Sequence, residues 1–98
     1  MPKYHITCYC YQCNGGNDET KSGESAKKGY TAACHPNKYN SLKNKKIFIQ
    51  GVGYRWIKDV YNKKLPENRI DVYVGDTGSC TCDDNDINGE REVTFIKD

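Results

Sequence analysis

The chain has neither a long apolar run nor much net charge, and each absence excludes a class of protein. No stretch of its 98 residues approaches the roughly 18 consecutive apolar residues that a membrane-spanning helix needs. Its first residues also lack the apolar segment of a signal peptide. The formal net charge of +2 gives no basis for binding nucleic acid or an anionic membrane. We therefore expect the chain to be soluble and to bind neither nucleic acid nor a membrane. If it works outside a cell, we expect that its export signal was removed or that another route releases it.

Helical periodicity is missing too, whereas short runs rich in β-branched and aromatic residues recur along the chain. Polar, glycine-containing segments separate these runs, which lie at residues 3–11, 30–34, 47–50, 54–59, 69–74 and 92–97. Six short strands without a long helix predict an all-β fold, a small barrel or sandwich. The length fits one domain, so we expect residues 1–98 to form a single domain, and the chain to be a monomer.

Six cysteines are many for a chain of this length, and they allow two interpretations. An even number in a small chain is typical of disulfides formed in an oxidising compartment. Alternatively, Cys10 and Cys13 have the spacing of zinc ligands, and Cys80 with Cys82 would complete a set of four thiolates. The one-residue gap in the second pair is tighter than usual, so the sequence favours disulfides or plain thiols. We expect no metal or other cofactor, and the cysteine pairing stays open.

Two aspartates inside strand-like runs, Asp59 and Asp71, are the main candidates for a functional site. Charged residues are depleted from strands, so each carboxylate either faces solvent or lines a site. Two carboxylates held close together resist simultaneous ionisation, and the protonated one is then a general acid for glycosidic cleavage. The nearby Arg55 and Arg69 would instead favour the ionised form. Spacing alone favours an Asp71 that faces solvent.

A set of motifs spread over residues 4–97 adds a second line of inference. The motifs are Thr7-Cys-Tyr-Cys-Tyr-Gln-Cys-Asn-Gly15, Thr20-Lys-Ser-Gly23, Ala33-Cys-His-Pro36, residues 42–53, Ile57-Lys-Asp59, Asn68-Arg-Ile-Asp-Val-Tyr73 and Val93-Thr-Phe-Ile96. Together they resemble the 3D domain, a family named for three aspartates and similar to the catalytic core of membrane-bound lytic transglycosylase A. The most specific part of the resemblance is residues 68–73 in combination with Asp59.

The resemblance implies a double-psi β-barrel and a peptidoglycan lytic transglycosylase. Such an enzyme cleaves the bond between N-acetylmuramic acid and N-acetylglucosamine without hydrolysis. One carboxylic acid protonates the leaving oxygen, and its carboxylate then takes the proton of the muramic acid 6-hydroxyl, which closes a 1,6-anhydro ring. Asp71 matches this catalytic acid, and Asp59 matches the residue beside it. The implied partner is the peptidoglycan glycan strand, and the implied location is extracytoplasmic, at the cell wall or in a phage.

Two positions depart from the family pattern. His35 stands where the family has its first aspartate, and Val60-Tyr61 follow Asp59 where the family has Thr-Gly-Gly. Histidine can donate, accept and carry charge, so we expect it to contact substrate. The other expected substrate-binding residues are Tyr61, Arg69 and Tyr73, the last because it shares a strand face with Asp71. The alternative interpretation is a non-catalytic module that binds cell-wall glycan, or a phage-encoded interaction domain.

Overall fold

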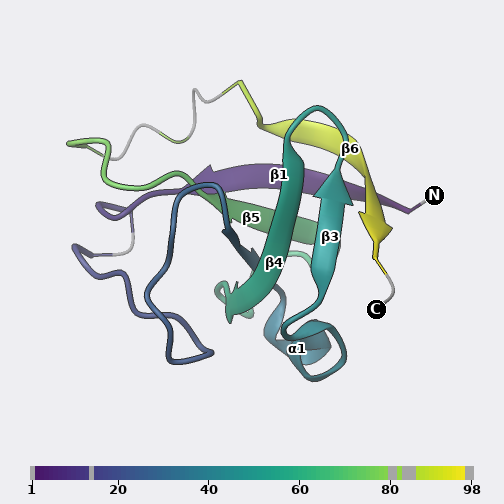
Figure 1. The fold of residues 1–98 in the computed structure, drawn as a ribbon, viewed down its shortest axis with the longest axis horizontal. Coiled ribbons are helices and arrows are strands. Elements are labelled where there is room, and N and C mark those ends of the chain that lie inside the picture. The colour runs from purple at the N-terminus through teal and green to yellow at the C-terminus, as the bar shows by residue number, and fades with distance from the viewer. Residues whose placement is uncertain (1, 14, 80–81, 83–85, 97–98) are drawn as a thin grey trace.

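Six strands close into one barrel, in the order β1-β5-β2-β4-β3-β6 around its wall (Figure 1). The computed structural model describes residues 2–13, 15–79, 82 and 86–96. The strands are β1 (Lys3–Tyr9), β2 (Thr31–Cys34), β3 (Lys46–Ile49), β4 (Gly53–Val60), β5 (Arg69–Tyr73) and β6 (Gly89–Phe95), and one helix, α1 (Pro36–Leu42), lies between β2 and β3 in the chain. The predicted small six-stranded all-β barrel is therefore confirmed, with strand ends that differ by up to three residues.

The barrel is filled by one side of each strand. Alternate residues of a strand point to opposite faces, so Ile70 and Val72 of β5 face inward while Asp71 and Tyr73 face outward. The inward residues form one apolar cluster of Ile6, Ala32, Cys34, Ile47, Ile49, Ile57, Ile70, Val72 and Val93. Most of these residues are β-branched, and such side chains pack well on a pleated surface.

The barrel mixes parallel and antiparallel neighbours. β1 runs parallel to β5, and β2 runs parallel to β4, whereas the other four pairings are antiparallel. Parallel neighbours need long crossover connections, and the predicted double-psi topology contains such connections. Residues 10–13, 15–30 and 74–79 lie together at one side of the barrel (Figure 1), where the Tyr11 amide donates to the Gly75 carbonyl at 2.9 Å.

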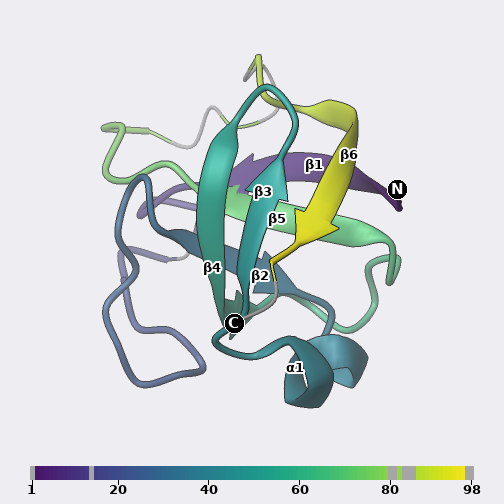
Figure 2. The same cartoon turned by 45° about the vertical axis from the view of Figure 1, so that its right-hand side comes forward.

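Helix α1 is the one element of the fold that the strand pattern did not predict; it lies at one end of the barrel (Figure 2). The helix buries none of its residues, so it lacks the apolar periodicity by which a helix is recognised. It is fixed at its start instead. The ring of His35 accepts a hydrogen bond from the Asn37 amide, and Pro36 occupies the first turn, where a missing amide proton costs nothing. Among the described residues, no helix is long and apolar enough to cross a membrane.

Candidate functional site

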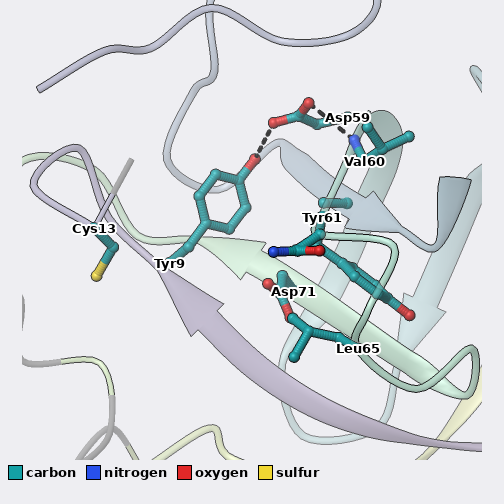
Figure 3. Close-up of a pocket in the computed structure, with 9 residues that line it drawn as sticks. Tyr9, Cys13, Asp59, Val60, Tyr61, Leu65 and Asp71 are labelled. Carbon is teal, nitrogen blue, oxygen red and sulfur yellow. Dashed lines mark hydrogen bonds between the residues drawn. The ribbon is translucent and has the colours of Figure 1, made fainter. Parts of the chain in front are cut away.

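A cavity of about 280 Å³ opens on the outer face of the barrel, where β1, β2, β4 and β5 meet the loop after β4 (Figure 3). It is lined by Tyr9, Cys13, Ala33, Asp59, Val60, Tyr61, Asn62, Leu65 and Asp71. Both candidate carboxylates are in this wall. Spacing alone favoured an Asp71 that faces solvent. In the structure, Asp59 and Asp71 instead line the same cavity.

Asp59 and Asp71 reach the cavity from either side of one small residue. Ala33 of β2 is in register with Asp59 on β4 and with Asp71 on β5. Residues in register on neighbouring strands point to the same face, so both carboxylates share the face of the Ala33 methyl group. The small side chain of Ala33 leaves the space between them open.

A shift in register brings Asp59 to this face. Along β2 the partners on β4 change from Ile57, opposite Ala32, directly to Asp59, opposite Ala33, so Lys58 is left out of the ladder. In an unbroken strand Asp59 would share the inward face of Ile57, because alternate residues point the same way. The bulge turns it outward instead. Re-aiming a side chain beside a site is a recurrent use of β-bulges.

Asp71 is held by a cation and a hydroxyl. Arg69, two residues earlier on the same strand face, donates from Nε to Oδ1 at 2.6 Å and from Nη2 to Oδ2 at 3.3 Å. The Thr7 hydroxyl, opposite Asp71 on β1, donates to Oδ1 as well. Asp71 is only 6% exposed, so these contacts stabilise its carboxylate where little water does.

Asp59 is held by three donors that carry no charge. The amides of Val60 and Lys21 donate to Oδ1 at 2.9 and 3.0 Å, and the Tyr9 hydroxyl donates to Oδ2 at 3.1 Å (Figure 3). Burial, together with the charge and hydrogen bond of Asp59, raises the pKa of Tyr9 above its usual range. Tyr9 therefore stays a neutral donor at any physiological pH. These contacts engage both carboxylate oxygens and fix the orientation of Asp59 in the cavity wall.

Tyr61 closes the cavity beside Asp71. Its hydroxyl donates to the Pro66 carbonyl at 2.5 Å, and burial raises the pKa of Tyr61 to about 12. The guanidinium of Arg69 lies 5.7 Å from the ring centre, within the range of a cation–π contact. Tyr61 thus presents its ring, with its hydroxyl already engaged by the loop that follows.

The other predicted substrate-binding residues are arranged around this wall rather than in it. His35 is 3% exposed and packs edge-on against Tyr61, with ring centres 5.7 Å apart. Its Nε2 lies 2.9 Å from the Lys63 carbonyl, and its Nδ1 accepts from the Asn37 amide. One nitrogen must then donate and the other accept, which defines the neutral Nε2–H tautomer.

Tyr73 is buried against Tyr9, with ring centres 5.1 Å apart. The two arginines named from the sequence differ in their contacts. Arg69 binds the Asp71 carboxylate, whereas Arg55 donates to the Tyr54 carbonyl.

Sequence reasoning missed two residues of β1 that contact the carboxylates. Thr7 and Tyr9 are two apart on a strand, so their shared face was readable from the sequence. Their position was not, because it depends on the parallel pairing of β1 with β5, which places Thr7 beside Asp71 and Tyr9 beside Tyr73. Asn62 and Leu65, from the irregular loop after β4, were also missed and carried no pattern that could reveal them.

The cysteines of the alternative zinc interpretation are partly brought together. The sulfur atoms of Cys10, Cys13 and Cys82 all lie within 4.8 Å of one another. The fourth predicted ligand, Cys80, lies outside the described residues. Cys13 also lines the cavity, so this sulfur cluster adjoins the carboxylate site.

Comparison of the chain with protein-family models, with curated proteins and with solved structures gave no match. The resemblance to the 3D domain stays a prediction from the motifs.

Proposed function

We propose that this barrel is a lytic-transglycosylase-like enzyme that cleaves the glycan strand of peptidoglycan, at the cell wall or as part of a phage, with Asp71 as its single acid and base. The observation that supports this proposal is the pair of buried carboxylates, Asp59 and Asp71, on either side of Ala33 in the wall of one cavity. They are also the two aspartates that match the family motifs.

The contacts of the two carboxylates suit unequal roles. Asp71, in its protonated form, gives its proton to the glycosidic oxygen and then, as a carboxylate, takes the proton of the 6-hydroxyl that attacks the anomeric carbon. Arg69 and Thr7 stabilise the carboxylate that the first step produces. Asp59 is oriented by three donors, and as a carboxylate it stabilises the positive charge that develops on the sugar ring.

The test is muropeptide analysis of purified cell walls incubated with the protein. We expect soluble products that end in 1,6-anhydromuramic acid, and we expect them to disappear with Asp71→Asn. Asp76→Asn is the matched control, because Asp76 is an exposed aspartate of the loop after β5 and does not line the cavity. The proposal fails if the native chain gives no anhydro product, or if D71N and D76N release it equally well.

A second candidate function is a module that binds cell-wall glycan without cleaving it. The ion pair between Arg69 and Asp71 favours it, because the guanidinium already contacts both oxygens of the carboxyl group that an acid catalyst must turn towards the glycosidic oxygen. His35 points the same way, since both of its ring nitrogens are engaged within the fold. This candidate predicts that the protein sediments with insoluble peptidoglycan and releases no fragment. A protein that remains in the supernatant excludes it.

A further inference from the structure

The sulfur cluster formed by Cys10, Cys13 and Cys82 lies outside the apolar core of the barrel. The core cluster includes Cys34 but none of these three residues. Cys10 and Cys82 instead form a second small buried cluster with Cys8, against which Val74 and Ile87 pack. Residue 82 also contacts the barrel, because the Cys8 thiol of β1 donates to the Cys82 carbonyl at 3.4 Å. The sulfur cluster thus lies where the loop after β1 meets residue 82.

The distances within the cluster suit a single metal ion. Cys13 Sγ lies 3.0 Å from Cys10 Sγ and 3.5 Å from Cys82 Sγ. Zinc binds thiolates at about 2.3 Å in a tetrahedron, which places two ligand sulfurs about 3.8 Å apart. A movement of less than an ångström at each sulfur is enough to reach that geometry.

The backbone near Cys10 is arranged to support a thiolate. The Cys13 amide donates to Cys10 Sγ at 3.2 Å, across the two-residue spacer between them. An amide that donates to sulfur stabilises negative charge there. Cys10 is completely buried, so an unligated thiolate at this position would be costly, whereas one bound to a cation would not.

We propose that the reduced chain binds one zinc ion through Cys10, Cys13 and Cys82, with the fourth position open to a further donor. Cys13 is disulfide-bonded in this structure, so the metal-bound and disulfide forms are alternative states. A phosphine reduces the disulfide to two thiols: the phosphine takes the oxygen of one water molecule to become its oxide, and the two protons of that water go to the sulfurs. Zinc then displaces the protons of the three thiols into solvent. The assignment does not depend on the proposed glycan chemistry, although Cys13 borders the cavity.

Binding would act on the cavity through one shared residue. Cys13 is both a ligand and part of the cavity wall, so the metal would fix that wall against residue 82, which is 69 positions away in the sequence. Structural zinc sites contribute folding free energy in this way.

The experiment is a titration of the whole chain, reduced with a phosphine under inert gas, with Co²⁺ as a spectroscopic probe. We expect a thiolate-to-cobalt charge-transfer band and the intense visible bands of tetrahedral cobalt, at one ion per chain, and we expect Zn²⁺ to bleach both. The protein kept oxidised should give neither. Absence of the charge-transfer band in the reduced native chain overturns the proposal, whatever the variants do.

Variants locate the ligands. Cys10→Ser and Cys82→Ser should weaken binding by more than about tenfold, which is the lower end of the loss seen on removing even a residue that only supports a zinc ligand. Cys34→Ala is the matched control, because Cys34 is as buried as Cys10 but lies in the barrel core. If a serine variant does not fold, the thermal midpoint of the reduced native chain decides: zinc should raise it and a chelator should reverse the rise. Equal loss in C34A, or a midpoint that zinc leaves unchanged, contradicts the assignment.

Discussion

Asp59 and Asp71 are placed opposite the same residue, Ala33, from two strands that do not touch each other. Neighbouring strands lie about 4.8 Å apart, so the backbones of the two aspartates are separated by about 10 Å. The gap between the carboxylates is therefore set by β2, and the smallness of Ala33 keeps it open.

Replacing Ala33 with valine tests the importance of that gap. Valine is favoured in strands but adds two methyl groups between the carboxylates, so we expect a loss of glycan cleavage or binding with the fold retained. Overpacking costs roughly 1–3 kcal/mol, so the thermal midpoint must be measured beside activity. A33V that folds and still acts on or binds cell walls like the native chain would show that sugar does not enter between Asp59 and Asp71.

Arg69→Gln tests the ion pair at the proposed acid. Glutamine can still donate a hydrogen bond to Asp71 but carries no charge, so the contact that stabilises the carboxylate becomes weaker. We expect glycan cleavage to slow, because that carboxylate forms in the first step of the proposed reaction. Arg55→Gln is the control, because Arg55 donates to the Tyr54 carbonyl instead. Equal rates for the two variants would remove Arg69 from the mechanism.

His35→Ala tests whether the histidine supports the fold at the start of α1. Removing an N-cap side chain costs about 0.5–2 kcal/mol, and here the contact with the Lys63 carbonyl is lost as well. Asparagine is a good N-cap, so His35→Asn should recover part of the loss. Denaturant unfolding measures both. If H35A is as stable as the native chain but no longer binds cell walls, the histidine contacts substrate after all.

Tyr61→Phe tests the response of the fold to alkali. The pKa of Tyr61 is raised by burial from 10.0 to about 12, so folding disfavours its phenolate. Its contribution to stability is complete below pH 10 and is lost as pH rises through 12. Burial likewise raises the pKa of Cys34 to about 11, so some alkaline sensitivity should remain without Tyr61. We expect the free energy of unfolding of Y61F to fall less steeply with pH between 10 and 12 than that of the native chain. An unchanged slope would mean that Tyr61 is not buried as described.

The sequence was informative wherever structure repeats with a short period. Alternation along residues 69–74 predicted that Tyr73 shares a strand face with Asp71, and this is confirmed, with Ile70 and Val72 of the opposite face in the core. The same alternation would have placed Asp59 with Ile57 inside the barrel. Only the bulge at Lys58 turns it outward, and a one-residue slip of this kind follows from how β2 and β4 pack, with no local sequence pattern to announce it.

The residues that contact the two carboxylates likewise divide into those that local sequence could reveal and those that depend on long-range packing. Arg69 could be matched to Asp71 because the two are alternate residues of one strand. Thr7 and Tyr9 could not be assigned, because the aspartates that they contact lie 64 and 50 positions away in the sequence. Helix α1 was missed because it is short and brings little apolar periodicity: Tyr39 and Leu42 pack against the core, but none of its residues is fully buried.

The pairing of β1 also bears on how the chain folds. Its two neighbours are β5 and β6, and it makes no pairing with β2, β3 or β4, which follow it in the chain. The backbone N–H and C=O groups of β1 therefore stay unpaired until β5 and β6, near the end of the barrel sequence, are present. Folds dominated by such distant pairings form slowly and expose unpaired strands meanwhile. During synthesis this barrel is accordingly most vulnerable to aggregation and proteolysis in the interval before its final strand arrives.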